Sequence, residues 1–250
     1  MTDQIVTELD AGVAVVTLNK PARRNALGSE STAALMAVLT RLGEDPACRV
    51  VVLTGAPPAF CAGSDLKELG TLDVPQMCAH EAETARMARQ IGLLPVPVVA
   101  AVEGYALGGG MILAISCDVV VTARGARWNL PEVPNGWLPP WGLQALMARV
   151  GPVRARLLTW GVTPVDGPEA LRLGIADVLA EDGAALDSAL ELAGRLAALP
   201  ENAVRSTKRY FEPFAMADAE RQDAEASRVF AADAMGAVSQ ATLAKFAVKA

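Results

Sequence analysis

Before residue 125 the sequence repeats one local design: an apolar strand, a loop of small residues, and the start of a helix. The first copy is RVVVLTG (49–55) followed by AFCAGSDL (59–66), and the second is VPVVAAVEG (96–104) followed by YALGGGMI (105–112). Uniformly apolar strands that alternate with helices are typical of a largely parallel sheet covered by helices. We therefore predict an α/β fold.

Hydrophobic patterning extends this framework through the first half of the chain. Alternating residues on both sides of Asp10-Ala11-Gly12 predict a hairpin of two short strands. Apolar residues at helical spacing predict several helices, and a further buried strand follows the second glycine loop. The expected segments are a hairpin over 5–20, helices over 29–45, 76–92 and 109–116, and a strand over 118–123.

The second half of the chain is mainly helical. Strand signals nearly vanish after residue 140, and a clear helix over 185–199 stops at Pro200. We divide the chain into a core over 1–195 and a C-terminal helical region over 196–250. That region is Ala-rich and amphipathic with little core of its own, so it should pack on the body or on another subunit.

Composition and charge exclude several classes of function. The chain has 250 residues, 52% of them hydrophobic, and a net charge of −6, which argues against a general nucleic-acid or membrane-surface role. No unbroken apolar run reaches the ~18 residues of a membrane span, and the polar N-terminus does not resemble a signal peptide. The four cysteines show no CxxC spacing, and no metal-ligand pattern occurs. We expect a cytoplasmic protein with free thiols, no metal, and no nucleic-acid or membrane partner.

The two small-residue loops carry the chemistry that we consider first. Amides at a helix start have no intrahelical partner and lie at the positive end of the helix dipole. Two of them facing one point would polarise a carbonyl and hold the charge of an enolate, and one such donor contributes roughly 3 kcal/mol in a transition state. Alternatively, these glycines only allow helix and strand to pack tightly.

Four motifs give a family resemblance: NKPARRNAL (19–27), AFCAGSDLKEL (59–69), VEGYALGGG (102–110) and LPEV (130–133). In this order and at these separations they resemble the crotonase superfamily, the enoyl-CoA hydratase/isomerase group, from about residue 5 to at least 180. The resemblance implies a crotonase-like spiral of ββα units with a C-terminal helical trimerisation region, assembled as a homotrimer or homohexamer. It also implies an acyl-CoA thioester substrate, with no cofactor besides the CoA that the substrate carries.

Carried over by position, the backbone amides of Ser64 and Gly109 would be the oxyanion donors. Other positions would bind CoA, with Arg23, Arg24 and Lys67 as sources of positive charge in this acidic chain. Asp65 could instead cap the helix that follows it, and Lys67 could be an ordinary exposed lysine. The CoA-binding positions that the resemblance implies are Ala22, Arg24, Ala62, Ser64, Asp65, Leu66, Lys67 and Gly109.

One acid stands where hydratases of this family have two. Their first glutamate lies three residues after the middle glycine of GGG, which is Ile112 here, and their second lies twenty residues later, which is Glu132. Ile112 cannot accept a proton or orient water, so two-glutamate hydration is in doubt. A single carboxylate in an apolar pocket, its pKa raised by burial, can take and return a proton near neutrality. Alternatively, Glu132 is a helix-start residue favoured by the dipole after Pro131.

Tryptophans gather around this acid, and they line an acyl pocket or belong to the core. The acyl-pocket candidates are Ile112, Trp137, Pro140 and Trp141, and Trp128 is a further tryptophan nearby. His80 matches no catalytic position and is expected on the surface or in a lid. Cys61, with no basic partner in view, is expected to be a small buried residue.

We predict an acyl-CoA enzyme that stabilises an enolate, with Glu132 as its acid–base residue, and double-bond isomerisation is its most economical reaction. A second reading is hydration, hydrolysis or decarboxylation of a particular CoA ester. A third is a protein that binds acyl-CoA without catalysis, which the replacement by Ile112 favours. Burying the Glu132 carboxylate would bring a pure binder no benefit.

Overall fold

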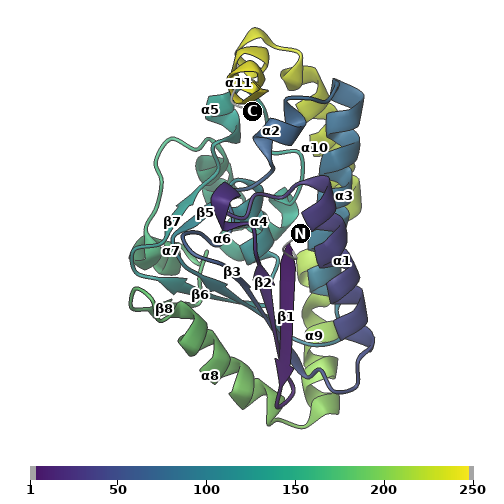
Figure 1. Cartoon of the computed structure of the whole chain (residues 1–250), viewed down its shortest axis with the longest axis vertical. Coiled ribbons are helices and arrows are strands. Elements are labelled where there is room, and N and C mark those ends of the chain that lie inside the picture. The colour runs from purple at the N-terminus through teal and green to yellow at the C-terminus, as the bar shows by residue number, and fades with distance from the viewer. Residues whose placement is uncertain (1–3, 248–250) are drawn as a thin grey trace.

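The computed structural model describes residues 4–247, which form a six-stranded sheet of order β1-β2-β3-β4-β6-β8 and a separate pair β5-β7 (Figure 1). Only the β1–β2 hairpin is antiparallel, and each later strand runs parallel to its neighbours. The predicted α/β fold is confirmed. The strands are β1 (Ile5–Asp10), β2 (Val13–Leu18), β3 (Val50–Gly55), β4 (Val98–Val102), β5 (Tyr105–Leu107), β6 (Val119–Ala123), β7 (Arg127–Asn129) and β8 (Val178–Ala180).

The hairpin turns at Ala11 and Gly12, as the sequence predicts. Both residues have positive φ, 46° and 85°, so this two-residue turn follows the right-handed twist of the flanking strands. The hairpin is therefore closed by local turn chemistry.

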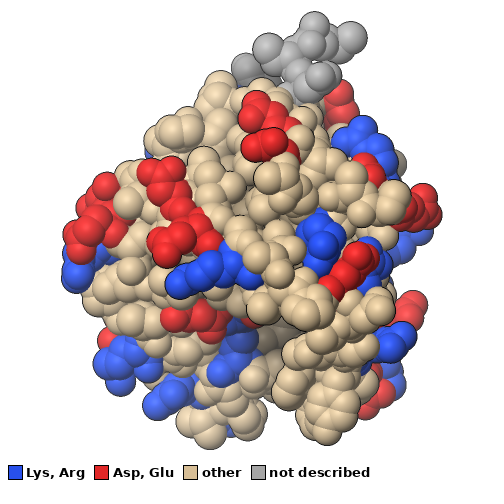
Figure 2. Space-filling model, turned by 90° about the horizontal axis from the view of Figure 1, so that it is seen from below, with Lys and Arg blue, Asp and Glu red and all other residues tan. Residues whose placement is uncertain are grey.

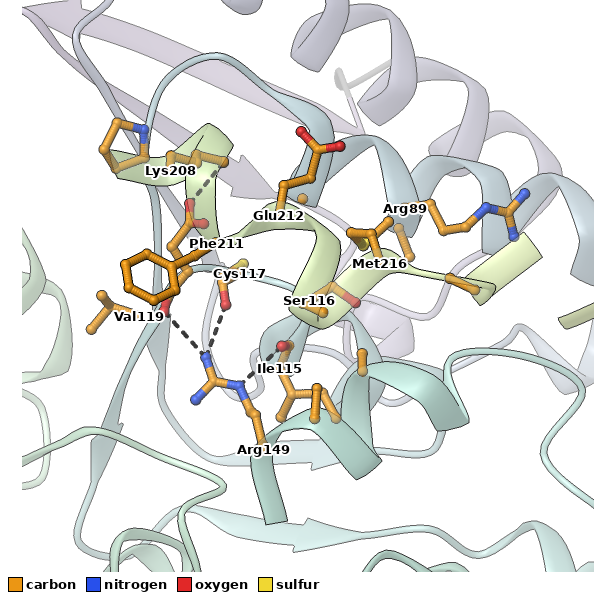
Figure 3. Close-up of a pocket in the computed structure, with 18 of the residues that line it drawn as sticks. Arg89, Ile115, Ser116, Cys117, Val119, Arg149, Lys208, Phe211, Glu212 and Met216 are labelled. Carbon is orange, nitrogen blue, oxygen red and sulfur yellow. Dashed lines mark hydrogen bonds and ion pairs between the residues drawn. The ribbon is translucent and has the colours of Figure 1, made fainter. Parts of the chain in front are cut away.

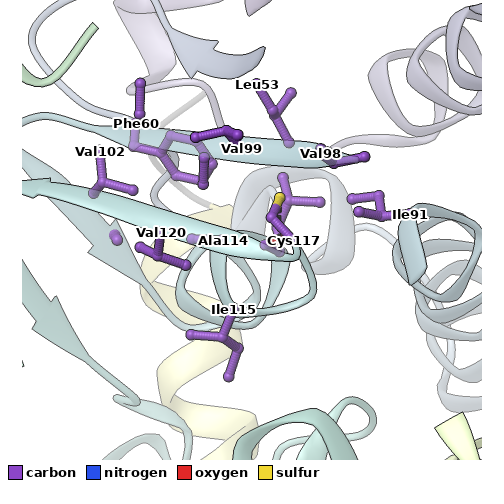
Figure 4. Close-up of a cluster of buried hydrophobic side chains, with 14 of the residues drawn as sticks. Leu53, Phe60, Ile91, Val98, Val99, Val102, Ala114, Ile115, Cys117 and Val120 are labelled. Carbon is purple, nitrogen blue, oxygen red and sulfur yellow. Dashed lines mark hydrogen bonds between the residues drawn. The ribbon is translucent and has the colours of Figure 1, made fainter. Parts of the chain in front are cut away.

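Helices cover the sheet and explain its uniformly apolar strands. α8 (Ala185–Ala197) packs on β3, β4 and β6, while α1 (Ser29–Glu44) and α3 (Val74–Leu93) lie side by side on the far side of the sheet (Figure 1). Figure 4 shows β4 valines between Leu53, Phe60 and Ile91, and Val98, Val99 and Val102 have no exposed surface. Strands buried on both faces need no polar alternation.

α3 begins two residues earlier than the apolar pattern indicates because a capping box precedes it. The Asp73 carboxylate accepts a 2.8 Å hydrogen bond from the Gln76 amide, and the Gln76 side chain accepts one of 2.9 Å from the Asp73 amide. This cap defines where α3 begins.

Short elements complete the body, and two of them correct the sequence-based expectation. β7 and β8 contain three residues each, too few for a periodic signal, and β8 pairs with β6 beyond residue 140, where strand signals nearly vanish. α6 is kinked where Gly151, with φ 75°, precedes Pro152. The remaining body elements are the 3₁₀ turn η1 (Pro21–Arg23), α2 (Leu66–Leu69), α4 (Gly109–Ile115), α5 (Glu132–Asn135), α6 (Leu143–Thr159) and α7 (Gly167–Leu173).

The C-terminal helices pack on the body of their own chain. α10 (Ala219–Ala234) lies on α3 and α6, and α11 (Ala237–Ala247) lies on α2 and α5. α9 (Glu201–Met216) packs on α3 and α6 and keeps no residue fully buried. A trimerisation role for this region stays a prediction.

Buried cations fasten α9 and α6 to the start of β6 (Figure 3). The Lys208 ammonium donates hydrogen bonds to the Ile91 and Val96 carbonyls, at 3.0 and 2.8 Å, and to Asp118 Oδ2 at 2.7 Å. The Arg149 guanidinium donates to carbonyl oxygens at the end of α4, among them that of Cys117 at 2.9 Å. α9 is thus held by directional polar contacts rather than by its own core.

The surface mixes charges of both signs. On the face shown in Figure 2, acidic and basic side chains are interspersed among uncharged ones. Within residues 4–247, no helix has the length and apolar character required to cross a bilayer.

Candidate active site

A cavity of about 60 Å³ lies where the two small-residue loops meet, and α3, α5 and the tryptophan-bearing loop enclose it. The residues from the first loop that line it include Ala62, Ser64 and Leu66. Gly109 lines it from the second loop. The structure therefore brings both predicted amide donors to one small enclosed space.

The two loops touch through their glycines. The Leu107 amide donates to the Cys61 carbonyl at 3.0 Å, which pairs the loops side by side. A Cβ on Gly110 would lie 2.1 Å from that carbonyl oxygen, and a Cβ on Gly63 would lie 3.1 Å from the Gly109 nitrogen. The glycines therefore allow the two loops to pack tightly, and this packing brings the start of α4 up to the first loop.

Both amides are placed to remain available to a ligand. Gly109 is the first residue of α4, where an amide has no intrahelical acceptor. Around Ser64, the bridge to Leu27 uses the Leu27 and Asp65 amides and leaves the Ser64 amide outside it. Such a pair of donors suits an oxygen atom that gains negative charge.

The Glu132 carboxylate lies directly beside these donors. Glu132 opens α5, as the helix-start reading proposes, and Gly108 approaches it so closely that a Cβ there would lie 2.6 Å from Oε1. Its other oxygen is buried without a hydrogen-bond partner among the described residues. Burial raises the pKa of Glu132 to about 8; hydrogen bonding within its own residue opposes this shift, and the charge of Glu81 adds to it. At neutral pH this carboxyl is poised to exchange a proton.

A second carboxyl, Glu81, enters the cavity from α3, and the sequence-based analysis missed it. Glu81 is 3% exposed, and the Trp141 indole N–H donates to its Oε2 at 2.7 Å. Burial raises the pKa of Glu81. The charge of His80 and the hydrogen bonds from Ser64 and Trp141 act in the opposite direction and lower it by less. The signal was present: Glu81 lies four residues after Met77 and before Ala85, on the apolar stripe of the predicted helix.

The acyl-pocket candidates form the apolar walls. Ile112 is 1% exposed, and a Cβ on Gly142 would lie 2.0 Å from its methyl group. Trp137 packs edge-to-face on Phe230 of α10, with ring centroids 6.2 Å apart. Pro140 and Trp141 line the cavity as well. Trp128, by contrast, is fully buried away from it and donates to Thr122 at 3.1 Å.

The positions expected to bind CoA are divided between two places. Ala62, Ser64, Leu66 and Gly109 line the cavity, whereas Ala22, Arg24, Asp65 and Lys67 lie outside its lining. Ala22 is exposed and Lys67 is half-buried. The Arg24 guanidinium lies 5.2 Å from the centre of the Tyr105 ring.

Asp65 has a structural role that the sequence already suggested. Its carboxylate accepts from the Lys67 amide at the start of α2 and pairs with Lys20 at 3.1 Å and Arg23 at 2.7 Å. Burial alone would raise the pKa of Asp65, but the hydrogen bonds and charges of the two cations hold it below its usual value. Arg23, expected as a source of charge for CoA, is thus already engaged by Asp65.

The remaining expectations concern His80 and Cys61. The surface or lid position expected for His80 is wrong, because the residue is 7% exposed and its Nδ1 lies 3.1 Å from the Ser29 hydroxyl. It lies three residues after Met77 and beside Glu81, both of which are buried on the inner side of α3. Cys61 is fully buried, and burial raises the pKa of its thiol to about 12. Cys61 is therefore the small buried residue that we expected.

The geometry defines a class of site: two loop amides, one of them at the start of α4, and two carboxyls around one small cavity, suited to polarising a carbonyl and moving a proton. Comparison with known proteins then identifies the family. The enoyl-CoA hydratase/isomerase family model matches residues 8–249, and the chain belongs to this family.

Individual relatives agree with this assignment. The short-chain-enoyl-CoA hydratase of Clostridium acetobutylicum is 32% identical over 209 residues, which cover 83% of this chain and 80% of that protein. The crotonyl-CoA hydratase of Syntrophomonas wolfei is 31% identical over 208 residues, covering 82% and 80%. The crystal structure of an enoyl-CoA hydratase/isomerase from Mycobacterium paratuberculosis superposes with a TM-score of 0.88 at 26% identity, covering 98% of this chain and 99% of that one. The resemblance to the crotonase superfamily is therefore confirmed.

Proposed function

We propose that this protein is an acyl-CoA enzyme that moves a double bond: it converts a 3-enoyl-CoA thioester to the 2-enoyl isomer. The observation that carries this proposal is the state of Glu132. Its carboxyl is buried beside Gly108 and Gly109, one oxygen has no partner among the described residues, and its pKa is raised to about 8. A base with these properties can remove a proton near neutral pH and return it.

In this reaction the amides of Ser64 and Gly109 hold the thioester oxygen. Glu132 removes a proton from C2, the carbon next to the carbonyl, and the electron pair spreads over a dienolate whose oxygen carries the charge. Donors fixed before the reaction stabilise this charge without reorganising, which is the main advantage of such a site. Protonation at C4 then gives the 2-enoyl product. No further cofactor is required, because CoA arrives with the substrate.

The apolar residue at position 112 favours isomerisation over hydration. Ile112 is 1% exposed and packs against Gly142, so this wall of the cavity offers water no polar anchor. Excluding water protects a dienolate from side reactions. The wall thereby suits a reaction in which no water is added.

Hydration is the second candidate, and a specific observation favours it. Relatives about one-third identical are named hydratases, and Glu81 supplies a second buried carboxyl to the cavity. Addition of water needs one group that activates water and one that protonates carbon. Two carboxyls meet that requirement even without an acid at position 112.

The experiment compares the two reactions directly. Purified wild type and Glu132→Gln are each given 3-hexenoyl-CoA and crotonyl-CoA, and isomerisation and hydration are followed by chromatography. We expect isomerisation to be the faster reaction in wild type and to fall by about 1,000-fold in Glu132→Gln, within the usual range for loss of a general base. Faster hydration of crotonyl-CoA would make the protein a hydratase, and full activity of Glu132→Gln would refute the role of Glu132.

A further inference from the structure

Glu81 is a buried carboxyl at a place where helix packing alone would favour an apolar residue. It lies on the inner stripe of α3 between Met77 and Ala85, and it is 3% exposed. Burying a carboxyl costs free energy unless hydrogen bonds and charges compensate it. The hydrogen bond from the Trp141 indole serves one of its oxygens. Because burying this carboxyl costs free energy, its position on the inner stripe of α3 indicates a chemical role.

The position of Glu81 in the candidate active site indicates what this role is. Glu81 lines the same cavity as Glu132, Ser64 and Gly109, and it arrives from a different element. α3, which carries Glu81, and α5, which carries Glu132, lie on opposite sides of α2 and α4 in Figure 1. The two carboxyls thus reach one cavity from different elements.

We propose that Glu81 is the second proton-transferring carboxyl of this site and acts in place of the acid that is absent at position 112. The inference rests on the proposed function and extends it. Glu132 takes the proton from C2 of the bound thioester, and Glu81 gives a proton to C4.

The proton balance closes without a further reactant. At the start Glu132 is ionised and Glu81 is protonated. The C2–H bond breaks toward Glu132, the double bond shifts, and a new C4–H bond forms with the proton of Glu81. Glu132 is then protonated and Glu81 is ionised. One proton passing from Glu132 to Glu81 through solvent restores the starting state.

The electrostatics of the cavity suit this division of roles. The charged groups that act on Glu81 are His80 beside it on α3 and Glu132 across the cavity on α5. Two carboxyls near each other hold one proton more readily than two negative charges, so the pair shares a proton over an interval of pH. Burial favours the protonated form of Glu81, which is the form that donates.

The test separates proton removal from proton delivery. Conversion of 3-hexenoyl-CoA in D₂O is followed by NMR, which reports deuterium at C2 and at C4 independently. Glu81→Gln keeps an oxygen that accepts from the Trp141 indole and removes the transferable proton. We expect isomerisation to fall by about 100-fold in this variant, while exchange at C2 stays within about fivefold of wild type.

Glu83→Gln is the matched control, because it makes the same substitution on the same helix at a side chain that is 56% exposed. It should isomerise at the wild-type rate. Trp141→Phe removes the hydrogen bond to Glu81 but leaves its carboxyl, so it should retain deuterium delivery to C4 at a reduced rate.

The results that overturn the inference are distinct from those that overturn the proposed function. Wild-type isomerisation and C4 labelling in Glu81→Gln, or an equal loss of C2 exchange and isomerisation there, would remove Glu81 from proton delivery. Persistence of C2 exchange in Glu132→Gln would instead refute the proposed base.

Discussion

Gly108 provides the space that the Glu132 carboxylate occupies, since a Cβ on Gly108 would lie 2.6 Å from Glu132 Oε1. Gly108 also has φ 54° and ψ −128°, a conformation that residues with a side chain rarely adopt. The residue that precedes the oxyanion donor therefore also sets the position of the proposed base.

The first prediction follows from this contact. Gly108→Ala should displace the Glu132 carboxyl and lower isomerase activity by about 100-fold, the usual cost of misplacing a catalytic group by about 1 Å. CoA-ester binding should change little, because the added methyl faces the carboxyl. Steady-state kinetics, with binding measured by calorimetry, would separate the two effects.

Gly183→Ala is the control for backbone strain alone. Gly183 has φ 83°, and a Cβ there would meet no atom within 4 Å. It should lose stability as any strained position does while retaining activity. Equal loss of activity in both variants would show that strain, and not the contact with Glu132, is responsible.

The second prediction concerns the pH dependence of proton removal. Glu132 acts as a base only when ionised, so the rate of exchange at C2 should rise with pH and level off above its pKa of about 8. Exchange at C2 measured from pH 6 to 9.5 tests this statement, and a profile flat over this range would contradict it.

Much of this site was predictable from the sequence, and the reasons are local. Glycines such as Gly63 and Gly110 allow two backbone segments to approach each other closely, and in a sequence they mark loops. The GGG motif likewise marks the start of α4. Glu132 could be found because the family resemblance places an acid there, twenty residues after the position of Ile112.

Glu81 was missed for a physical reason of a different kind. Its place on the apolar stripe of α3 is a local signal, but its hydrogen-bond partner Trp141 is sixty residues away in sequence. A local pattern does not show that this carboxyl lines the same cavity as Glu132. The inward position of His80 escaped notice for the same reason, and β8 was missed because its three residues acquire strand geometry only by pairing with β6.

The third prediction is that the proposed base reduces the stability of the fold. Folding raises the pKa of Glu132 from its ordinary 4.5 to about 8, so the folded state binds this proton more tightly than the unfolded state. The associated stability is fully present below pH 4.5 and is lost as the pH rises toward 8. Glu132→Gln should therefore be more stable than wild type at pH 8, by on the order of 3 kcal/mol. Urea denaturation at pH 5 and 8 measures the difference, which should shrink at the lower pH.

The fourth prediction concerns the attachment of α9. Lys208 is a cation whose side chain is 6% exposed, and it joins Asp118 to the Ile91 and Val96 carbonyls. Lys208→Met keeps the length of the side chain but removes the ammonium donor from all three acceptors. Among the described residues, the Ile91 carbonyl and Asp118 then keep only the backbone amides of Leu94 and Val98. Removing one partner from such a network costs about 3 kcal/mol. Arg195→Met is the control, because Arg195 is 69% exposed in a single-turn pair with Glu191 and should cost less than about 0.5 kcal/mol. If thermal unfolding shows equal shifts for the two variants, α9 does not depend on Lys208 for its attachment.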